Sequence, residues 1–384
     1  MDLKTKSIKG MTLALLMLIA AMAGCIGTED ETDESESGVD DKPAFLDSAD
    51  AGYTYASNVD NHRSLMQDLC DIKTAASNSE WDEAKSIYTD GKNAEKSDGS
   101  FRTLAGFAAA SGKNHNYDTF YGQDGAIGAH IMAAMDGTGD FEGASDTVRY
   151  QGIAKLTANM GMVGYTIHEL NAAVAKADGG NTDNDSGAPH NWDEGWAFFH
   201  GPDEHWSCSP AYTMKKRAAD YGTETNGVSN ALAASEQAMV DGLAALQAGD
   251  KAGYDAATDT VVKNIIITYS QATLKNTMKM DSNESAAKYQ AEDYAFWKTM
   301  EAYAADHTNA CVHADGNVTY VGDSGASSCG ENETFDARYG ADKINEILNL
   351  SDASKHGTSY DVAPHLEMVW AHYGITDDDI GTYQ

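Results

Sequence analysis

A histidine and a glutamate four residues apart form the most reactive pattern in the sequence. They lie in residues 187–201 (GAPHNWDEGWAFFHG), where His190 and Glu194 would share one face of a helix that begins near Pro189. Trp192, Trp196 and Phe199 recur at helical spacing and would form its apolar face. The helix therefore offers an imidazole and a carboxylate, the donors that hard and borderline metal ions prefer.

A weaker copy of this segment follows about a hundred residues later. Residues 192–199 (WDEGWAFF) align with 290–297 (QAEDYAFW), which pairs Glu194 with Glu292. The preceding segments 163–170 and 267–274 also align, although His168 has an alanine as its counterpart. A degenerate repeat of a helical pair predicts that Glu194 and Glu292 face each other inside a bundle.

His168 lies among apolar residues in the middle of a predicted helix. A histidine in such a place is either a packed core residue or a ligand, and the nearby Tyr165 and the His190/Glu194 pair favour the ligand. His168 and Glu169 match the first two residues of the zinc-protease motif H-E-x-x-H. The motif requires a histidine at residue 172, which is an alanine here, so a zinc peptidase is excluded. The predicted metal ligands are therefore His168, His190, Glu194 and Glu292.

The first residues have the pattern of an export signal. Three lysines precede a short apolar run that ends in Ala23, Gly24 and Cys25. Residues 1–24 are predicted to be a lipoprotein signal peptide and Cys25 the lipidated residue, with a plain signal peptide or a membrane anchor as alternatives. The acidic residues 25–43 are predicted to be a disordered tether, and residues 44–384 the folded domain.

Charge and cysteine content narrow the functional classes. Removing residues 1–24 takes away three lysines and one aspartate, so the formal charge falls from −34 to −36, which excludes nucleic acid and anionic lipid surfaces as partners. Four cysteines remain after Cys25, without a C-x-x-C spacing. We expect Cys311–Cys329 to close a glycine-rich loop and Cys70–Cys208 to form a long-range bridge, although sequence alone leaves other pairings open.

The fold is predicted to be all-α, a multi-helix bundle stabilised by disulfides. Prolines are few and no segment alternates as a strand would. The expected helices cover residues 60–77, 79–90, 101–110, 125–135, 145–177, 189–200, 209–221, 228–247, 251–280, 284–306 and 336–348.

Three segments carry a family resemblance. Residues 81–93, 101–107 and above all 187–201 resemble the algal Fe-assimilating protein family, periplasmic proteins induced by iron deficiency or high carbon dioxide. The resemblance runs from about residue 58 to 306. It implies a helical protein outside the cytoplasm that aids iron acquisition, without indicating which residues bind the metal.

Together these patterns predict an extracytoplasmic, non-enzymatic lipoprotein on the cell surface or in the periplasm. It would bind Fe²⁺ or Fe³⁺, with manganese or zinc as alternatives, and assist an iron uptake system. Tyr165 or Tyr269 could also serve Fe³⁺. One alternative is a non-catalytic surface or adhesion module. A second is a ferritin-like metal oxidase, which is disfavoured because the chain lacks the two Glu-x-x-His motifs of that class.

Overall fold

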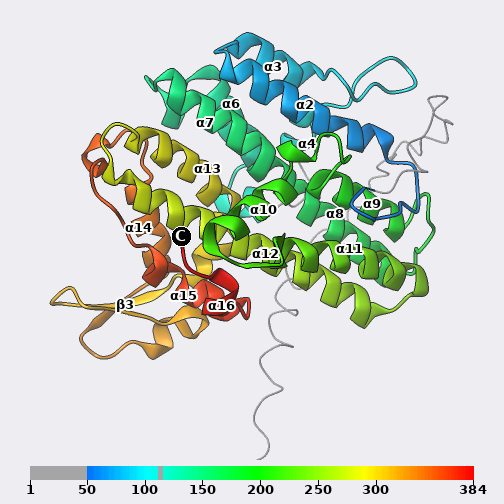
Figure 1. Ribbon diagram of the computed structural model, residues 1–384. Helices are drawn as coiled ribbons and strands as arrows, with labels where there is room; N and C mark the ends of the chain where they lie inside the picture. The colour runs from blue at the N-terminus through cyan, green and yellow to red at the C-terminus, as the bar shows by residue number, and fades with distance from the viewer. Residues whose placement is uncertain (1–49, 111–115) are drawn as a thin grey trace, which may run out of the picture. The chain divides into compact units, whose positions relative to one another are not determined.

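The computed structural model describes residues 50–110 and 116–384 (Figure 1). The predicted signal peptide 1–24, the lipidated Cys25 and the tether 25–43 lie outside these residues. Within the described part of the chain, no helix is both long enough and apolar enough to cross a membrane.

Helices make up most of the described chain, which confirms the predicted fold class. The longer helices are α2 (Asp60–Ser77), α3 (Trp81–Asp90), α6 (Ala126–Asp136), α7 (Asp146–Lys155), α8 (Met162–Asp178), α9 (Ala188–Phe199), α10 (Pro210–Tyr221), α11 (Asn230–Ala248), α12 (Lys251–Met278), α13 (Ala286–Ala304), α14 (Tyr339–Ile347) and α15 (Ala363–His372). Shorter ones are α4 (Leu104–Ala108), α5 (Asn116–Tyr121) and α16 (Asp377–Ile380).

The helix expected over residues 145–177 contains a π-helical turn, η3 (Leu156–Gly161), between α7 and α8. Such a turn widens the helix by one residue and turns side chains into new directions. Here it brings Asn159 into the core, where its Oδ1 accepts hydrogen bonds from Tyr269 (2.9 Å) and Thr213 (3.0 Å). The π-turn therefore ties the start of α8 to α12 and α10.

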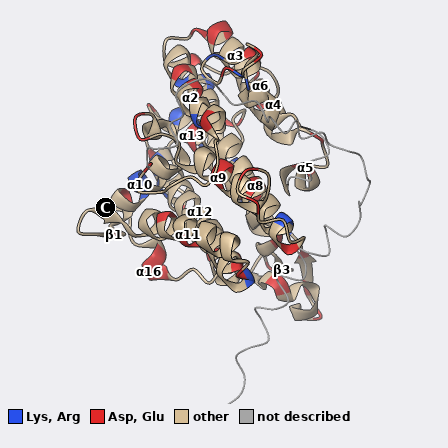
Figure 2. Cartoon of the chain, turned by 90° about the vertical axis from the view of Figure 1, so that its right-hand side faces the viewer, with Lys and Arg blue, Asp and Glu red and all other residues tan. Residues whose placement is uncertain are grey.

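Helix α8 packs against α9, and helix α12 packs against α13. These are the two helical pairs of the predicted repeat. Figure 2 shows α8 and α9 beside α11 and α12. Trp192 of α9 is fully buried and donates from Nε1 to the carbonyl of Met239 in α11 (2.8 Å). A Cβ on Gly242 would lie 2.1 Å from that indole ring, so α11 can approach α9 because residue 242 is glycine.

The loop expected between Cys311 and Cys329 is instead part of a small antiparallel sheet, with the strand order β4-β3-β5. Its strands are β3 (Ala310–His313), β4 (Val318–Tyr320) and β5 (Glu333–Asp336). A separate pair, β1 (Glu224–Thr225) and β2 (Val228–Ser229), forms a two-stranded sheet. The strands are too short to show alternation in the sequence, which is why a loop was expected here.

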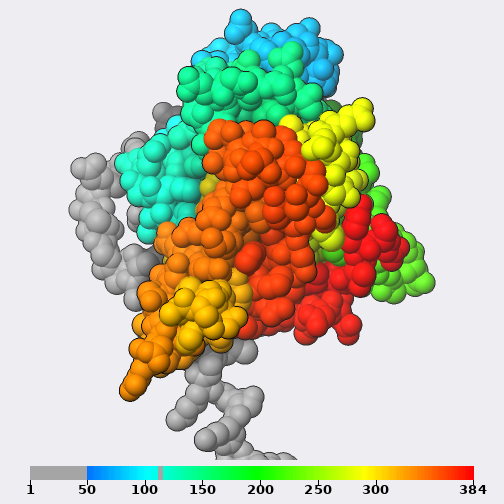
Figure 3. Space-filling model, turned by 90° about the vertical axis from the view of Figure 1, so that its left-hand side faces the viewer, coloured from blue at the N-terminus to red at the C-terminus, as the bar shows by residue number. Residues whose placement is uncertain are grey.

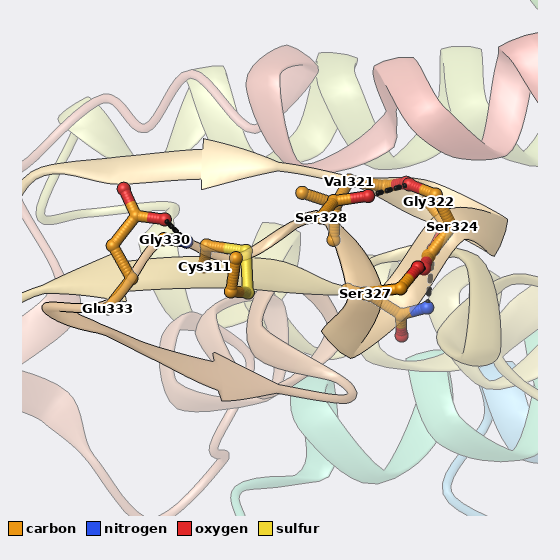
Figure 4. The surroundings of a disulfide bond; sticks show 10 residues. Cys311, Val321, Gly322, Ser324, Ser327, Ser328, Gly330 and Glu333 are labelled. Atoms are coloured by element: carbon orange, nitrogen blue, oxygen red, sulfur yellow. Dashed lines mark hydrogen bonds between the residues drawn. A yellow bond between two sulfur atoms is a disulfide. The ribbon is translucent and has the colours of Figure 1, made fainter.

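Two disulfides join distant parts of the fold, and both expected pairings are confirmed. Cys70 of α2 bonds Cys208 of η4 (Trp206–Cys208), with their Cα atoms 5.6 Å apart. Cys311 of β3 bonds Cys329, which follows the short helical segment η7 (Gly322–Ser328) (Figure 4). Figure 3 shows the residues after α13, orange to red, gathered on one face of the molecule.

Candidate metal centre

Helix α9 presents His190 and Glu194 on one face, as the sequence predicts. The Nε2 atom of His190 lies 3.2 Å from Oε1 of Glu194, one helical turn away. Trp192, Trp196 and Phe199 are fully buried on the other side, which fixes the rotation of the helix. Pro189 occupies the first turn, where its missing N–H leaves no hydrogen bond unmade.

A second imidazole reaches the same carboxylate from α2. The Nε2 atom of His62 lies 3.3 Å from Oε1 of Glu194, and the His62 ring packs edge-on against Phe198. His62 is 4 % exposed, and it stands on the buried face of α2 with Leu65, Met66 and Leu69. One oxygen of Glu194 is therefore shared by two histidines from different helices.

A second carboxylate, Glu169 of α8, makes a side-chain hydrogen bond with Glu194. Asn191 donates from Nδ2 to Oε2 of Glu169 at 2.7 Å and holds it in place. The side chains of Glu169 and Glu194 are only 7 % and 12 % exposed. Two carboxylates this close and this buried require positive charge or a shared proton between them.

The need for positive charge beside the two carboxylates explains the pKa shifts of Glu194 and His190. Burial opposes ionisation of Glu194, but the positive charge of His62 and the hydrogen bond from His190 outweigh it, so the pKa of Glu194 lies well below its usual value. Burial likewise works against the charged form of His190, yet the hydrogen bond to Glu194 raises the His190 pKa. A positive charge beside Glu194 is therefore favourable, whether it comes from a protonated imidazole or from a metal ion.

Residues around the centre orient His190. Asp193 accepts hydrogen bonds from Tyr53 Oη (2.6 Å), from the Ala56 and Ser57 amides (2.9 and 2.7 Å) and from Ser57 Oγ (2.8 Å). Ser57 Oγ also lies 2.8 Å from Nδ1 of His190. Because the single Ser57 hydroxyl proton points to Asp193, Nδ1 donates to Ser57 and Nε2 is directed at Glu194. Outer partners of metal-binding histidines commonly have this arrangement.

The other two predicted ligands lie elsewhere. His168 is on α8 with Nε2 4.0 Å from Oε1 of Glu169, so it borders the centre through that carboxylate. Glu292 is on α13, where Oε1 lies 3.4 Å from Nζ of Lys155. Among the described residues, the contacts of Glu194 are with His62, His190 and Glu169 and do not include Glu292.

His62 and Glu169 were not predicted as ligands. The available signal for His62 was a histidine within the apolar stripe of a clear helix, at i, i+3, i+4 and i+7 with Leu65, Met66 and Leu69. The sequence singles out Glu169 only through the H-E-x-x-H pattern, which Ala172 excludes. Spacing along the sequence could not show that α2, α8 and α9 meet at one point.

Comparison with known families gives a match over residues 46–324 to the low iron-inducible periplasmic protein family, Fea1. The match confirms the resemblance to iron-assimilation proteins and covers all four residues of the centre, His62, Glu169, His190 and Glu194. Searches of curated proteins and of solved structures gave no match. The family description links its members to the periplasm and to induction at low iron. The matched segment is more than half of the sequence, and the chain therefore belongs to the low iron-inducible periplasmic protein family.

Proposed function

We propose that the protein captures iron outside the cytoplasm at the centre formed by His190 and Glu194, with His62 and Glu169 as further donors. The observation that carries the proposal is the position of the Glu194 carboxylate, buried between two imidazoles and a second carboxylate. Iron is the cargo of this centre, and its charge would replace that of the imidazole protons. His168 and Glu292, the other two ligands predicted from the sequence, are also replaced in the iron-binding experiment below.

The donor chemistry supports iron without excluding its neighbours in the transition series. Two carboxylates and two imidazoles combine oxygen and borderline nitrogen donors, which suit Fe²⁺, Mn²⁺ and Zn²⁺. Binding requires neutral imidazole, so each ion that enters displaces protons. The family's induction at low iron favours iron as the physiological ion.

The location follows from the family description and the first residues of the chain. Cleavage after Gly24 and lipidation of Cys25 would anchor the protein, and residues 25–43 would hold the domain away from the membrane. In that position the domain would concentrate iron near an uptake system. Replacing Cys25 by serine should release the protein from membranes into the soluble extracytoplasmic fraction.

Anaerobic calorimetry with Fe²⁺ tests the proposal. Glu194→Gln keeps the size of the side chain but removes its charge, so the variant should lose one equivalent of bound iron or bind it at least about tenfold more weakly. Titrations with Mn²⁺ and Zn²⁺ give the selectivity.

Glu292→Gln is the matched control, because it removes the corresponding carboxylate of the repeat. It should bind iron like the unmodified chain, whereas His168→Gln should have a smaller effect than His190→Gln. Equal iron binding by the Glu194→Gln variant and the unmodified protein would refute the centre. Oxygen consumption on adding Fe²⁺ would instead identify an oxidase.

A further inference from the structure

A second group of metal-binding side chains lies in the C-terminal part of the chain, separate from the iron centre. His307 ends the short helix η6 (Ala305–His307), Asp323 lies in η7, and His372 is the last residue of α15. Nδ1 of His307 is 2.7 Å from Oδ1 of Asp323, and Nδ1 of His372 is 2.9 Å from Oδ2. One carboxylate thus bridges two imidazoles from different segments.

The spacing of the three side chains is close to that of a metal site. One ligand atom from each residue lies within 4.8 Å of the others. Around a tetrahedral ion with bonds of about 2.1 Å, neighbouring ligand atoms are about 3.4 Å apart. The group therefore needs to open by roughly half an ångström. Asp323 can make this adjustment because its side chain is 61 % exposed.

The two imidazoles favour a metal ion over a second proton. Their rings are stacked, with centroids 3.6 Å apart and planes 18° from parallel, so protonating both would put two positive charges face to face. Neutral imidazole is the form that binds metal ions.

The surrounding fold holds the three segments in place. The Cys311–Cys329 disulfide fastens the end of η7 to β3 (Figure 4). Asn309 donates from Nδ2 to the Gly322 carbonyl at 2.7 Å. On the other side, Tyr373 donates from its hydroxyl to the Tyr303 carbonyl at 3.0 Å, which ties the end of α15 to α13. Ligands fixed by their supporting structure bind an ion at a low entropic cost.

We propose that His307, Asp323 and His372 form a second metal site, which takes a divalent first-row transition ion such as Zn²⁺ and leaves its remaining positions to water. Two imidazoles and one carboxylate are a donor set for such ions. The bound ion would join η6, η7 and α15. His372 lies beyond the residues that match the family, so this site belongs to the C-terminal part of this chain.

Zinc titration of the full chain carrying Glu194→Gln tests the site independently of the iron centre. In this background we expect one equivalent of Zn²⁺ to bind and to raise the melting temperature. His372→Gln and Asp323→Asn should each weaken this binding at least tenfold. Asp323→Asn replaces an exposed side chain by one of equal size, so it tests the site even if the histidine variant folds poorly.

His313→Gln is the matched control, since His313 forms a similar exposed pair with Asp315 (2.9 Å) but has no second histidine in the group. The His313→Gln variant should bind zinc as tightly as its parent, the chain that carries Glu194→Gln alone. Co²⁺ should give visible absorption bands in the parent and the control that are lost in the His372→Gln variant. Failure of the folded parent to bind zinc, or equal binding in all variants, would overturn the proposal, whatever the outcome of the iron titration.

Discussion

At the scale of single residues, the orientation of His190 depends on a serine that does not itself reach Glu194. Ser57 bonds both Nδ1 of His190 and the Asp193 carboxylate. Ser57→Ala should therefore lower iron affinity by about 10- to 100-fold while the fold is retained. Calorimetry measures the affinity. Ser64→Ala, which removes a hydroxyl that donates to the Asp60 carbonyl within α2, should leave the iron affinity unchanged.

Asp293, next to the predicted ligand Glu292, gives the protein a pH-dependent stability. It is fully buried on α13, and burial raises its pKa well above the usual value. The unfolded chain ionises this group above about pH 4 while the folded chain keeps the proton, so the free energy of unfolding falls as the pH rises from there.

Asp293→Asn should remove this pH dependence, because an amide resembles the protonated acid and cannot ionise. The variant should match the unmodified protein near pH 4 and be more stable at pH 8. Urea unfolding at several pH values measures the difference. Parallel stability curves for the two proteins would show that Asp293 is ionised in the folded state.

The sequence predicted two of the four residues of the centre, His190 and Glu194. His190 and Glu194 could be predicted because one helix carries both, and helical spacing alone sets their contact. His62 and Glu169 come from other helices, and their approach depends on how α2 and α8 pack against α9. A repeat in the sequence pointed to Glu292, but in the structure this carboxylate pairs with Lys155.

At the scale of elements, the position of α9 depends on its close contact with α11. A methyl group at residue 242 would overlap the ring of Trp192. Gly242→Ala should cost about 1–3 kcal/mol of stability and weaken iron binding, because α9 must shift with its tryptophan. Thermal unfolding and iron titration measure the two effects. Asp241→Ala, on the exposed side of the same helix, should have little effect on either.

Helix boundaries were predictable where the apolar periodicity of the sequence is clear. Helix α2 matches the expected range, and α9 differs by one residue at each end. The strands near Cys311 and the helix α15 were missed. Each strand has three or four residues, too few for a pattern. Helix α15 has a proline, Pro364, in its first turn, a start signal that the sequence offered and the prediction did not use. His372 was therefore not considered as a ligand.

At the scale of the whole molecule, the net charge of −34 sets the response to salt. Repulsion among exposed carboxylates destabilises the compact state, and salt screens it. Raising sodium chloride from about 0.05 M to about 1 M should therefore raise the melting temperature of the metal-free protein. Potassium chloride at equal ionic strength should act alike. A fall in melting temperature would mean that favourable ion pairs dominate instead.

The Cys70–Cys208 disulfide makes the segment between these residues a closed covalent ring that contains α8 and α9. A protease cut in the exposed residues 183–186 opens the ring without dividing the molecule. His62 and Glu169 then belong to one fragment, and His190 and Glu194 to the other. We expect one band on a non-reducing gel, two after reduction, and iron binding that survives the cut but not the reductant.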